Sequence, residues 1–229
     1  MTGVQTCALP ICFPVTIAVV SGGDDGNIKI WEKQNGEYKD SKTLPHGSTV
    51  SSIAILNENT IVSGGDDGNI KIWEKQNGEY KESKTLSHGS TVTSITLLNE
   101  NTIVSGNGDG ILKIWEKQNG EYKESKTLSH GSPVRSIAIL NENIIVSGGY
   151  NGNIKIWEKQ NGEYKDPKIL PHGSTVTSIA ILKDDTIVSG GYYDNIKIWE
   201  IQYRDWETDR KSTRLNSSHR SLSRMPSSA

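Results

Sequence analysis

The sequence has little cysteine, little phenylalanine and no long apolar run. Its 229 residues include 2 cysteines, 1 phenylalanine and 7 prolines, and both cysteines, Cys7 and Cys12, lie near the start. Neither a disulfide framework nor a cysteine metal site can therefore be argued for the rest of the chain. No apolar run approaches the roughly 18 residues that a membrane-spanning helix needs, so a membrane is not expected as a partner.

Neither sign of charge is in excess. The chain has 25 Lys and Arg against 27 Asp and Glu, which gives a net charge of −2. Such a balance lacks the basic excess that neutralises phosphates, so nucleic acid is not expected as a partner either. The chain is instead rich in Ile, Val, Thr and Ser, with 23 Gly, 6 Trp and 8 Tyr. Because β-branched residues favour strands, this composition predicts a β-rich globular protein.

A unit of 42 residues is repeated along the chain. The string NIKIWEKQNGEYK recurs with few changes, and its tryptophan returns every 42 residues, at Trp31, Trp73, Trp115, Trp157 and Trp199. The histidine of an HGS triplet keeps the same period, at His46, His88, His130 and His172. A fixed period of this length indicates a repeat architecture.

Within one unit, residues 46–87, the pattern predicts four short strands. TVSSIAIL alternates apolar and small polar residues, TIVSGG ends in glycines, and NIKIWEKQ follows the turn signature DDGN. Asn77-Gly78 is a strong hairpin signal, after which EYKESKTL supplies the fourth strand. A four-stranded antiparallel sheet cannot bury both of its faces alone, so successive copies are expected to stack face to face.

The unit resembles the WD-repeat (Trp-Asp) β-propeller family over about residues 19–202. The resemblance rests on the histidine before the first strand, on SGGDDGNIKIW and on the acidic residue after the tryptophan. Trp-Asp is Trp-Glu in every copy, and Gly-His is Pro-His or Ser-His. The resemblance implies an all-β fold of four-stranded antiparallel propeller blades, with three full and two partial repeats in an incomplete ring.

The resemblance also implies a structural tetrad in each repeat. Tryptophan would donate to serine, serine would bond histidine, and histidine would bond an aspartate of the turn, each bond worth about 1 kcal/mol net. By position the tetrads are His46, Ser63, Asp67 and Trp73; His88, Ser105, Asp109 and Trp115; His130, Ser147, Asn151 and Trp157; and His172, Ser189 and Trp199. Asn151 and Tyr193 replace the aspartate in the last two repeats, which are therefore expected to be less well braced.

Family members bind partners on the face where two sets of turns open, before the first strand and between the second and third. The corresponding positions are Thr49, Ser51, Asp66, Thr91, Thr93, Pro133, Arg135, Tyr150, Thr175, Thr177, Tyr192 and Tyr193, together with Asp24 and Gly108. The near-identical copies differ at several of these positions, and Arg and Tyr are frequent in binding hot spots. Drift in tolerated turns explains the differences equally well; if they are functional, Arg135, Tyr150 and Tyr192 are the expected anchors.

The expected function is a non-catalytic scaffold that presents this turn face to a protein or peptide partner, without cofactor or metal. The repeated His, Ser and Asp do not indicate a catalytic triad, because a catalytic site is assembled once and this trio recurs in fixed register. GGDDGN lacks the alternating ligands and closing glutamate of a calcium loop. The alternative is a repeat-based, lectin-like propeller, because near-identical copies could supply several equivalent carbohydrate sites.

The two ends, residues 1–18 and 203–229, carry neither strand alternation nor the repeat. MTGVQTCALPIC and RDWETDRKSTRLNSSHRSLSRMPSSA resemble translated sequencing-adaptor or assembly artefacts, so artefactual or disordered appendages to a piece of a longer propeller are expected. No Lys or Arg precedes the apolar stretch ALPICFPVTIAVV, which argues against a signal peptide, and a cytoplasmic location is expected. An incomplete ring exposes apolar blade faces, which favour self-association.

Overall fold

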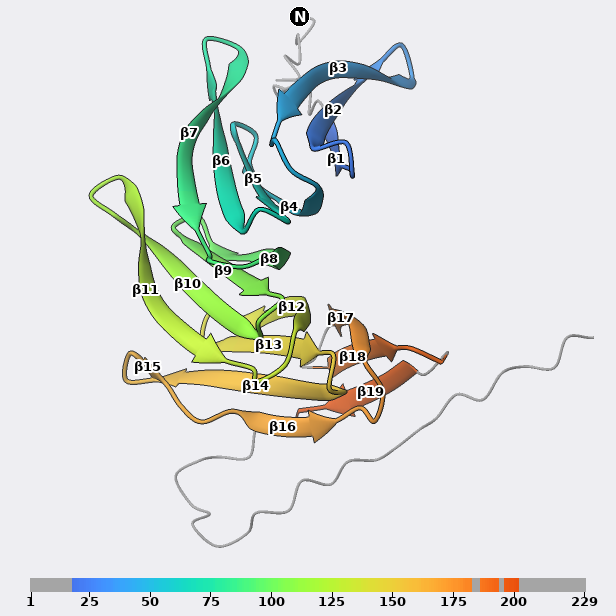
Figure 1. Ribbon diagram of the computed structural model, residues 1–229, viewed down its shortest axis with the longest axis vertical. Coiled ribbons are helices and arrows are strands. Elements are labelled where there is room, and N and C mark those ends of the chain that lie inside the picture. Colours follow the sequence, from blue (N-terminus) through green and yellow to red (C-terminus); the bar gives the residue numbers. More distant parts are fainter. Residues whose placement is uncertain (1–17, 183–185, 194–195, 202–229) are drawn as a thin grey trace, which may run out of the picture.

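A computed structural model describes residues 18–182, 186–193 and 196–201, which form five antiparallel sheets, numbered here as blades 1–5 (Figure 1). Blade 1 contains β1 (Ala18–Gly22), β2 (Asn27–Gln34) and β3 (Glu37–Pro45). Blade 2 contains β4 (Val50–Asn57), β5 (Thr60–Gly65), β6 (Asn69–Gln76) and β7 (Glu79–Ser87). Blade 3 contains β8 (Val92–Asn99), β9 (Thr102–Asn107), β10 (Ile111–Gln118) and β11 (Glu121–Ser129).

Blade 4 contains β12 (Val134–Asn141), β13 (Ile144–Gly149), β14 (Asn153–Gln160), β15 (Glu163–Tyr164) and β16 (Lys168–Pro171). Blade 5 contains β17 (Val176–Leu182), β18 (Thr186–Gly191) and β19 (Ile196–Glu200). The terminal segments interpreted as artefactual or disordered lie outside the described residues, except for Ala18. Among the residues described, there is no helix with the length and apolar character that crossing a membrane requires.

The strand boundaries follow the repeat. TIVSGG and NIKIWEKQ of the second unit form β5 and β6 over their whole length. The hairpin between β6 and β7 has positive φ at both turn residues, 52° at Asn77 and 83° at Gly78, as a type I′ turn requires. The predicted all-β fold of antiparallel, four-stranded propeller blades is confirmed, with three described strands in each of the two end blades.

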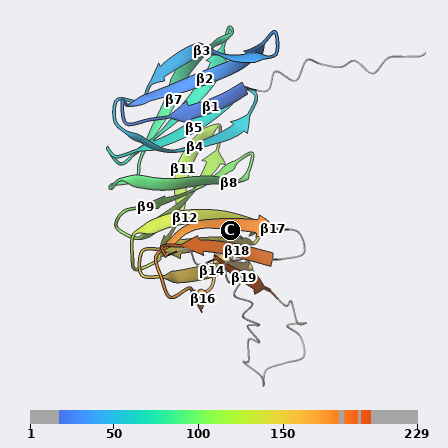
Figure 2. The ribbon, with the colours of Figure 1, turned by 90° about the vertical axis from the view of Figure 1, so that its right-hand side faces the viewer.

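The blades follow one another along an arc. The first strands of blades 2–5 contact each other in turn, so that β4 contacts β8, β8 contacts β12 and β12 contacts β17. Blades 1 and 5 lie at the two ends of the arc and do not meet, and the described residues therefore form an open ring (Figures 1 and 2).

The hydrophobic core lies between blades rather than within them. Ile70 and Ile72 on one side of β6 pack in a cluster with Trp115 of blade 3. Trp73, which points to the other side of β6, packs in a cluster with Ile30 of blade 1. The same alternation recurs between blades 3 and 4 and between blades 4 and 5. A blade therefore buries both of its faces only when it has a neighbour on either side.

The outer strand of blade 4 differs from the single strand predicted. β15 and β16 both pair with β14, and the residues between them, 165–167, belong to neither. In blade 2 the equivalent segment contains a bulge where Ser83 donates from its hydroxyl to the Ile72 carbonyl. Blade 4 has Pro167 at the position of Ser83. Proline has neither a hydroxyl nor a backbone N–H, so it cannot supply these bonds and the strand is interrupted there.

In each of blades 1–4 a valine of the next blade packs directly on a glycine of the second strand. A Cβ on Gly64 would lie 2.4 Å from Cγ1 of Val92, on β8, the first strand of blade 3. A Cβ on Gly106 would lie 2.6 Å from Cγ1 of Val134 in the same way. On the equivalent Gly190 of blade 5, a Cβ would meet no described atom within 4 Å. Close stacking therefore requires glycine at Gly64 and Gly106, whereas the space beside Gly190 is not filled by any described atom.

The role of this glycine as a seat for the valine can be tested with the matched variants Gly64→Ala and Gly190→Ala. Gly64→Ala is expected to lower the free energy of unfolding by about 1–3 kcal/mol, because the new methyl overlaps Val92 and β8 must shift. Gly190→Ala is expected to change it by less than about 0.5 kcal/mol, because the space is free. Urea denaturation of dilute protein, followed by tryptophan fluorescence, measures both. Equal losses would mean that glycine is needed for its backbone and not as a seat.

Candidate functional site

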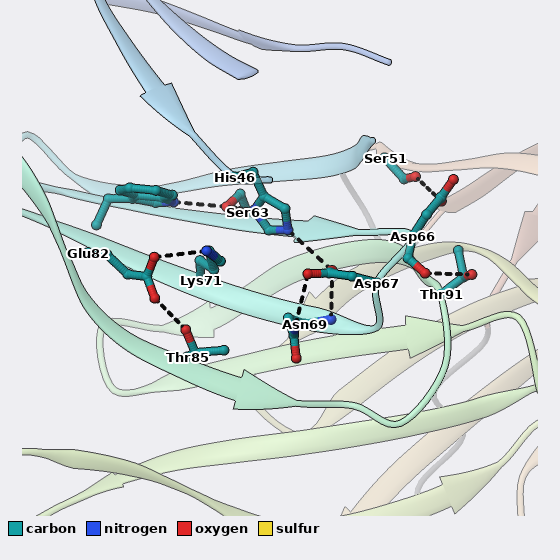
Figure 3. A network of polar contacts seen from close by, with 11 residues as sticks. His46, Ser51, Ser63, Asp66, Asp67, Asn69, Lys71, Glu82, Thr85 and Thr91 are labelled. Atoms are coloured by element: carbon teal, nitrogen blue, oxygen red, sulfur yellow. Dashed lines mark hydrogen bonds and ion pairs between the residues drawn. The ribbon is translucent and has the colours of Figure 1, made fainter. Parts of the chain in front are cut away.

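A chain of polar contacts connects the turn and the strands of blade 2 (Figure 3). Trp73 Nε1 donates to Ser63 Oγ at 2.9 Å, and Ser63 Oγ lies 2.8 Å from His46 Nδ1. His46 Nε2 lies 3.5 Å from Oδ1 of Asp67 in the turn between β5 and β6. Ser63 and His46 are 0% and 1% exposed, so the two bonds of Ser63, to Trp73 and to His46, supply partners to polar groups that are shielded from water.

The turn of blade 2 is held by its own side chains. Asp67 accepts hydrogen bonds from the backbone N–H of Asn69 at 3.1 Å and from its side-chain amide at 2.8 Å. Burial alone would raise the pKa of the Asp67 carboxyl, but the Asn69 bonds and the adjacent His46 hold it below its usual value. Burial lowers the pKa of His46, against the opposing charge of Asp67. At neutral pH the pair is therefore a neutral imidazole beside a carboxylate.

Blade 3 corrects the predicted tetrad of His88, Ser105, Asp109 and Trp115. Asn107 donates from its side-chain amide to His88 Nδ1 at 3.2 Å, and His88 Nε2 donates to the Ser105 carbonyl at 3.4 Å. The Asn107 Oδ1 accepts the backbone N–H groups of Asp109 and Ile111. Both nitrogens of His88 are thus engaged by groups other than Asp109. The physical reason is that blade 2 has Gly65, which has no side chain, at the position of Asn107. In blade 3 the Asn107 amide therefore occupies the place beside the histidine.

The tryptophan–serine bond recurs in each of the other four blades. The donor and acceptor atoms are 2.8–3.0 Å apart in the pairs Trp31–Ser21, Trp115–Ser105, Trp157–Ser147 and Trp199–Ser189. His130 and His172 lie 2.9 Å from Ser147 and Ser189 in blades 4 and 5. Asn151, at the aspartate position of blade 4, accepts the N–H of Asn153 instead. That these blades are less well braced stays a prediction.

The turn-face residues lie along one continuous arc, because backbone bonds join the two sets of turns. In each of blades 2–5 the residue before the turn aspartate position donates its N–H to the backbone carbonyl of the third residue after the histidine. The pairs are Asp66–Thr49 at 3.0 Å, Gly108–Thr91 at 2.9 Å, Tyr150–Pro133 at 2.9 Å and Tyr192–Thr175 at 3.1 Å. Thr91 and Thr175 also donate from their hydroxyls to the carbonyls of Asp66 and Tyr150 in the preceding blade.

Most hydroxyls among the predicted contact residues are used within the propeller itself. Ser51 donates to the Asp66 carboxylate at 3.1 Å, and Thr177 donates to the Gly190 carbonyl at 3.1 Å. Thr93 Oγ1 lies 2.6 Å from the Val134 carbonyl in the next blade. These side chains hold the turns in place, and the larger side chains of Tyr150 and Tyr192 remain exposed on this face.

Arg135, Tyr150, Tyr192 and Tyr193 define a tyrosine patch on blades 4 and 5. The guanidinium carbon of Arg135 lies 5.8 Å from the centre of the Tyr150 ring, a cation–π distance. The rings of Tyr192 and Tyr193 are 6.3 Å apart at an angle of 57°. The three tyrosines are 57%, 60% and 87% exposed. Tyr193 adopts a φ of 67°, a left-handed conformation that is uncommon for a residue with a Cβ.

Stacked antiparallel sheets with a repeated Trp–Ser contact define a β-propeller segment. The chain belongs to the WD40 family, whose model, described as "WD domain, G-beta repeat", matches residues 4–32, 38–74, 80–116, 122–158 and 166–200. The first match begins within residues 1–18, which the sequence pattern assigned to a non-repeat leader and which lie almost wholly outside the described residues. Within the part of the chain that the structure describes, no group of three His, Cys, Asp or Glu residues is placed to hold a metal.

Solved propellers resemble the chain at modest identity. The computationally designed Ika8 protein is 32% identical, with a TM-score of 0.63 over 80% of this chain and 55% of that one. The WD40 propeller domain of Doa1 is 26% identical, with a TM-score of 0.66 over 79% and 60%. The designed Ika4 protein is 32% identical, with a TM-score of 0.56 over 69% and 94%. The chain thus spans between half and two thirds of the first two structures. No curated protein matches it.

The two turn aspartates should differ in their contribution to stability. Asp67→Ala is expected to lower the free energy of unfolding by about 1–2 kcal/mol, because it removes the contact to buried His46 and the bonds from Asn69. Asp109→Ala is expected to lower the free energy of unfolding by less than about 0.5 kcal/mol, since His88 is hydrogen-bonded by Asn107 and not by Asp109. Urea denaturation measures both variants. A loss for Asp109→Ala as large as for Asp67→Ala would contradict the assignment to Asn107.

Acid should destabilise the propeller through its buried histidines. Burial, reinforced by the charge of Lys155, lowers the pKa of His130 from 6.5 to about 4. Between these pH values the unfolded chain binds a proton that the folded chain does not, so the free energy of unfolding falls as the pH falls. Burial also lowers the pKa values of His46 and His88, which act in the same direction. Urea midpoints measured at several pH values test this slope.

His130→Gln is the control for that slope, because it should reduce the loss of stability between pH 6.5 and about 4 without abolishing it. An NMR titration that placed the pKa of His130 near its ordinary value would contradict the prediction.

Proposed function

We propose that the chain is a non-catalytic interaction scaffold whose turn face, centred on the tyrosine patch, binds a protein or peptide partner. WD40 propellers are typically protein-interaction scaffolds, and the chain belongs to this family. The observation that supports a binding face at this place is the exposure of Tyr150, Tyr192 and Tyr193 at the turns, with Arg135 lying over the Tyr150 ring. The repeats are otherwise near duplicates, so the side chains that differ between blades are the ones that can give the face specificity.

The turn face suits binding because its backbone is fixed before a partner arrives. The bond from the Tyr150 N–H to Pro133 and the bond from Thr175 to the Tyr150 carbonyl hold this turn from two blades. A ring that is already positioned loses little conformational entropy on binding, and tyrosine offers a large contact area with few rotatable bonds. The contact with Arg135 restricts the Tyr150 ring further.

The partner that fits this face combines an apolar anchor with positive charge. Aromatic rings of the tyrosine patch occupy blades 4 and 5, whereas the turns of blades 1 and 2 carry the carboxylates of Asp24 and Asp66. An extended peptide with an aromatic or proline residue at one end and basic residues at the other matches both ends of the arc. Neither nucleic acid nor a membrane has this combination.

The lectin-like alternative is less well supported. Repeat-based carbohydrate binding relies on equivalent sites, one in each copy, but the position before the turn aspartate is Asp24, Asp66, Gly108, Tyr150 and Tyr192 in successive blades. A glycan array that returned binding with more than one ligand per chain would favour it over the scaffold.

The scaffold proposal is tested with a random-peptide display library selected on the full chain. Tyr150→Ala and Tyr192→Ala are each expected to weaken the selected peptides by roughly tenfold or more, as for hot-spot tyrosines, without lowering the melting temperature. Ile169→Ala is the control, because Ile169 is 51% exposed but lies on β16, away from the turn face. Fluorescence anisotropy of single labelled peptides measures affinity. Peptides that bind both patch variants as tightly as the wild type would overturn the proposal.

A further inference from the structure

The chain builds the same apolar interface four times, once between each pair of neighbouring blades. One half of each interface is a trailing face, which in blade 2 consists of Val62, Ile70 and Ile72, exposed by 1% or less. The other half is a leading face, whose described members in blade 3 include Ile103, Trp115 and Tyr122, exposed by 6% or less. Blade 5 has a trailing face and blade 1 a leading face, and each lacks its counterpart among the described residues.

The trailing face of blade 5 is open. Ile196 and Ile198 occupy the positions of Ile70 and Ile72, yet they are 60% and 38% exposed. Gly190 offers the seat that receives a valine in the interior blades, and that seat meets no described atom within 4 Å. The first half of a fifth interface is therefore present on β18 and β19.

The leading face of blade 1 is open in the same way. Val19 and Tyr38 occupy the positions of Ile103 and Tyr122, and they are 44% and 46% exposed. Trp31, at the position of Trp115, still donates to Ser21 and so keeps the orientation that its equivalents have. In blade 3 this face also includes Val92 and Ile95 of β8. Their equivalents in blade 1 are positions 8 and 11, which lie outside the described residues, so Val19, Trp31 and Tyr38 are the described apolar members.

We propose that the open trailing face of blade 5 binds the open leading face of blade 1 of a second copy of this chain. The contact is head to tail, because the two faces are different surfaces. It continues an interface that the chain already forms four times, with equivalent side chains in the same 42-residue register. A second copy is the occupant favoured, because blade 1 carries the residue types that interior trailing faces accept.

Charge complementarity supports the same pairing. Lys159 of blade 4 lies 3.8 Å from Glu116 of blade 3 in an ion pair that crosses an interior interface. The equivalent residues at the two open faces are Lys33 of blade 1 and Glu200 of blade 5. Docking in the interior register brings these opposite charges together and places no like charges opposite each other at this position.

The test uses the full chain, with its mass in solution measured by light scattering after size exclusion over a range of concentrations. The wild type is expected at two chain masses or more, where one chain is 25.1 kDa. Ile196→Glu blocks the trailing face and Val19→Glu blocks the leading face, so each variant alone is expected at one chain mass. Their equimolar mixture is expected to restore a two-chain species, because Ile196→Glu keeps an intact leading face and Val19→Glu keeps an intact trailing face.

Ile169→Glu is the matched control, since Ile169 is 51% exposed on β16, away from both open faces, and the variant should associate like the wild type. A wild type that stays at one chain mass overturns the proposal, whether its faces are free or covered by its own termini. If Val19→Glu still forms dimers, the proposal is overturned in favour of a contact between two trailing faces. A control that dissociates as fully as Ile196→Glu overturns it in favour of nonspecific apolar association.

A second measurement does not depend on placing a charge in the apolar face. Glu200→Lys is expected to weaken association by about two- to fivefold, the range of a surface ion pair. Lys33→Glu in the same chain is expected to restore it, because each docked pair then again joins opposite charges. Equal association of all three proteins would place Lys33 and Glu200 apart and overturn the proposed register.

Discussion

Neighbouring blades are held together by apolar side chains from two facing sheets, and the rest of the structure depends on this contact. Fully burying one isoleucine contributes roughly 1.5–3 kcal/mol, and Ile70 and Ile72 are almost wholly buried against the next blade. Because stacking uses the sheet faces, it leaves the turns at the ends of the strands free. The turn face is thus available for binding as a consequence of how the core is built.

The polar contacts of each blade are secondary to this stacking but restrict how it is achieved. A buried imidazole needs hydrogen-bond partners, and two blades satisfy that need in different ways. His46 lies against Ser63 and Asp67, whereas His88 is bound by Asn107. The residue that contacts the histidine therefore differs from blade to blade. In blade 4, where Asn151 stands at the aspartate position, the Trp157–Ser147 and His130–Ser147 contacts are still present.

Much of the fold could be predicted from the sequence, because periodicity and turn chemistry act locally. The bounds of β5 and β6 and the turn at Asn77 follow from strings that only one local structure suits. The failures came from single substitutions whose effect depends on tertiary distance. Nothing local shows that a side chain at Asn107 reaches His88, or that Pro167 falls at a bulge. The turn-face residues were predicted by position, but the contact of Arg135 with Tyr150 depends on strand register across a blade.

Near-identical repeats place opposite demands on the two kinds of surface. The stacking faces must stay alike, because each leading face has to fit the trailing face before it, and Ile103, Ile145 and Ile187 show this constraint. The turn side chains Tyr150 and Tyr192 are exposed and need not fit a facing sheet, so these positions are free to differ from blade to blade. Divergence at Tyr150 and Tyr192 therefore costs the fold little. An arc whose core is uniform and whose turns vary can acquire a specific binding surface without a change in its architecture.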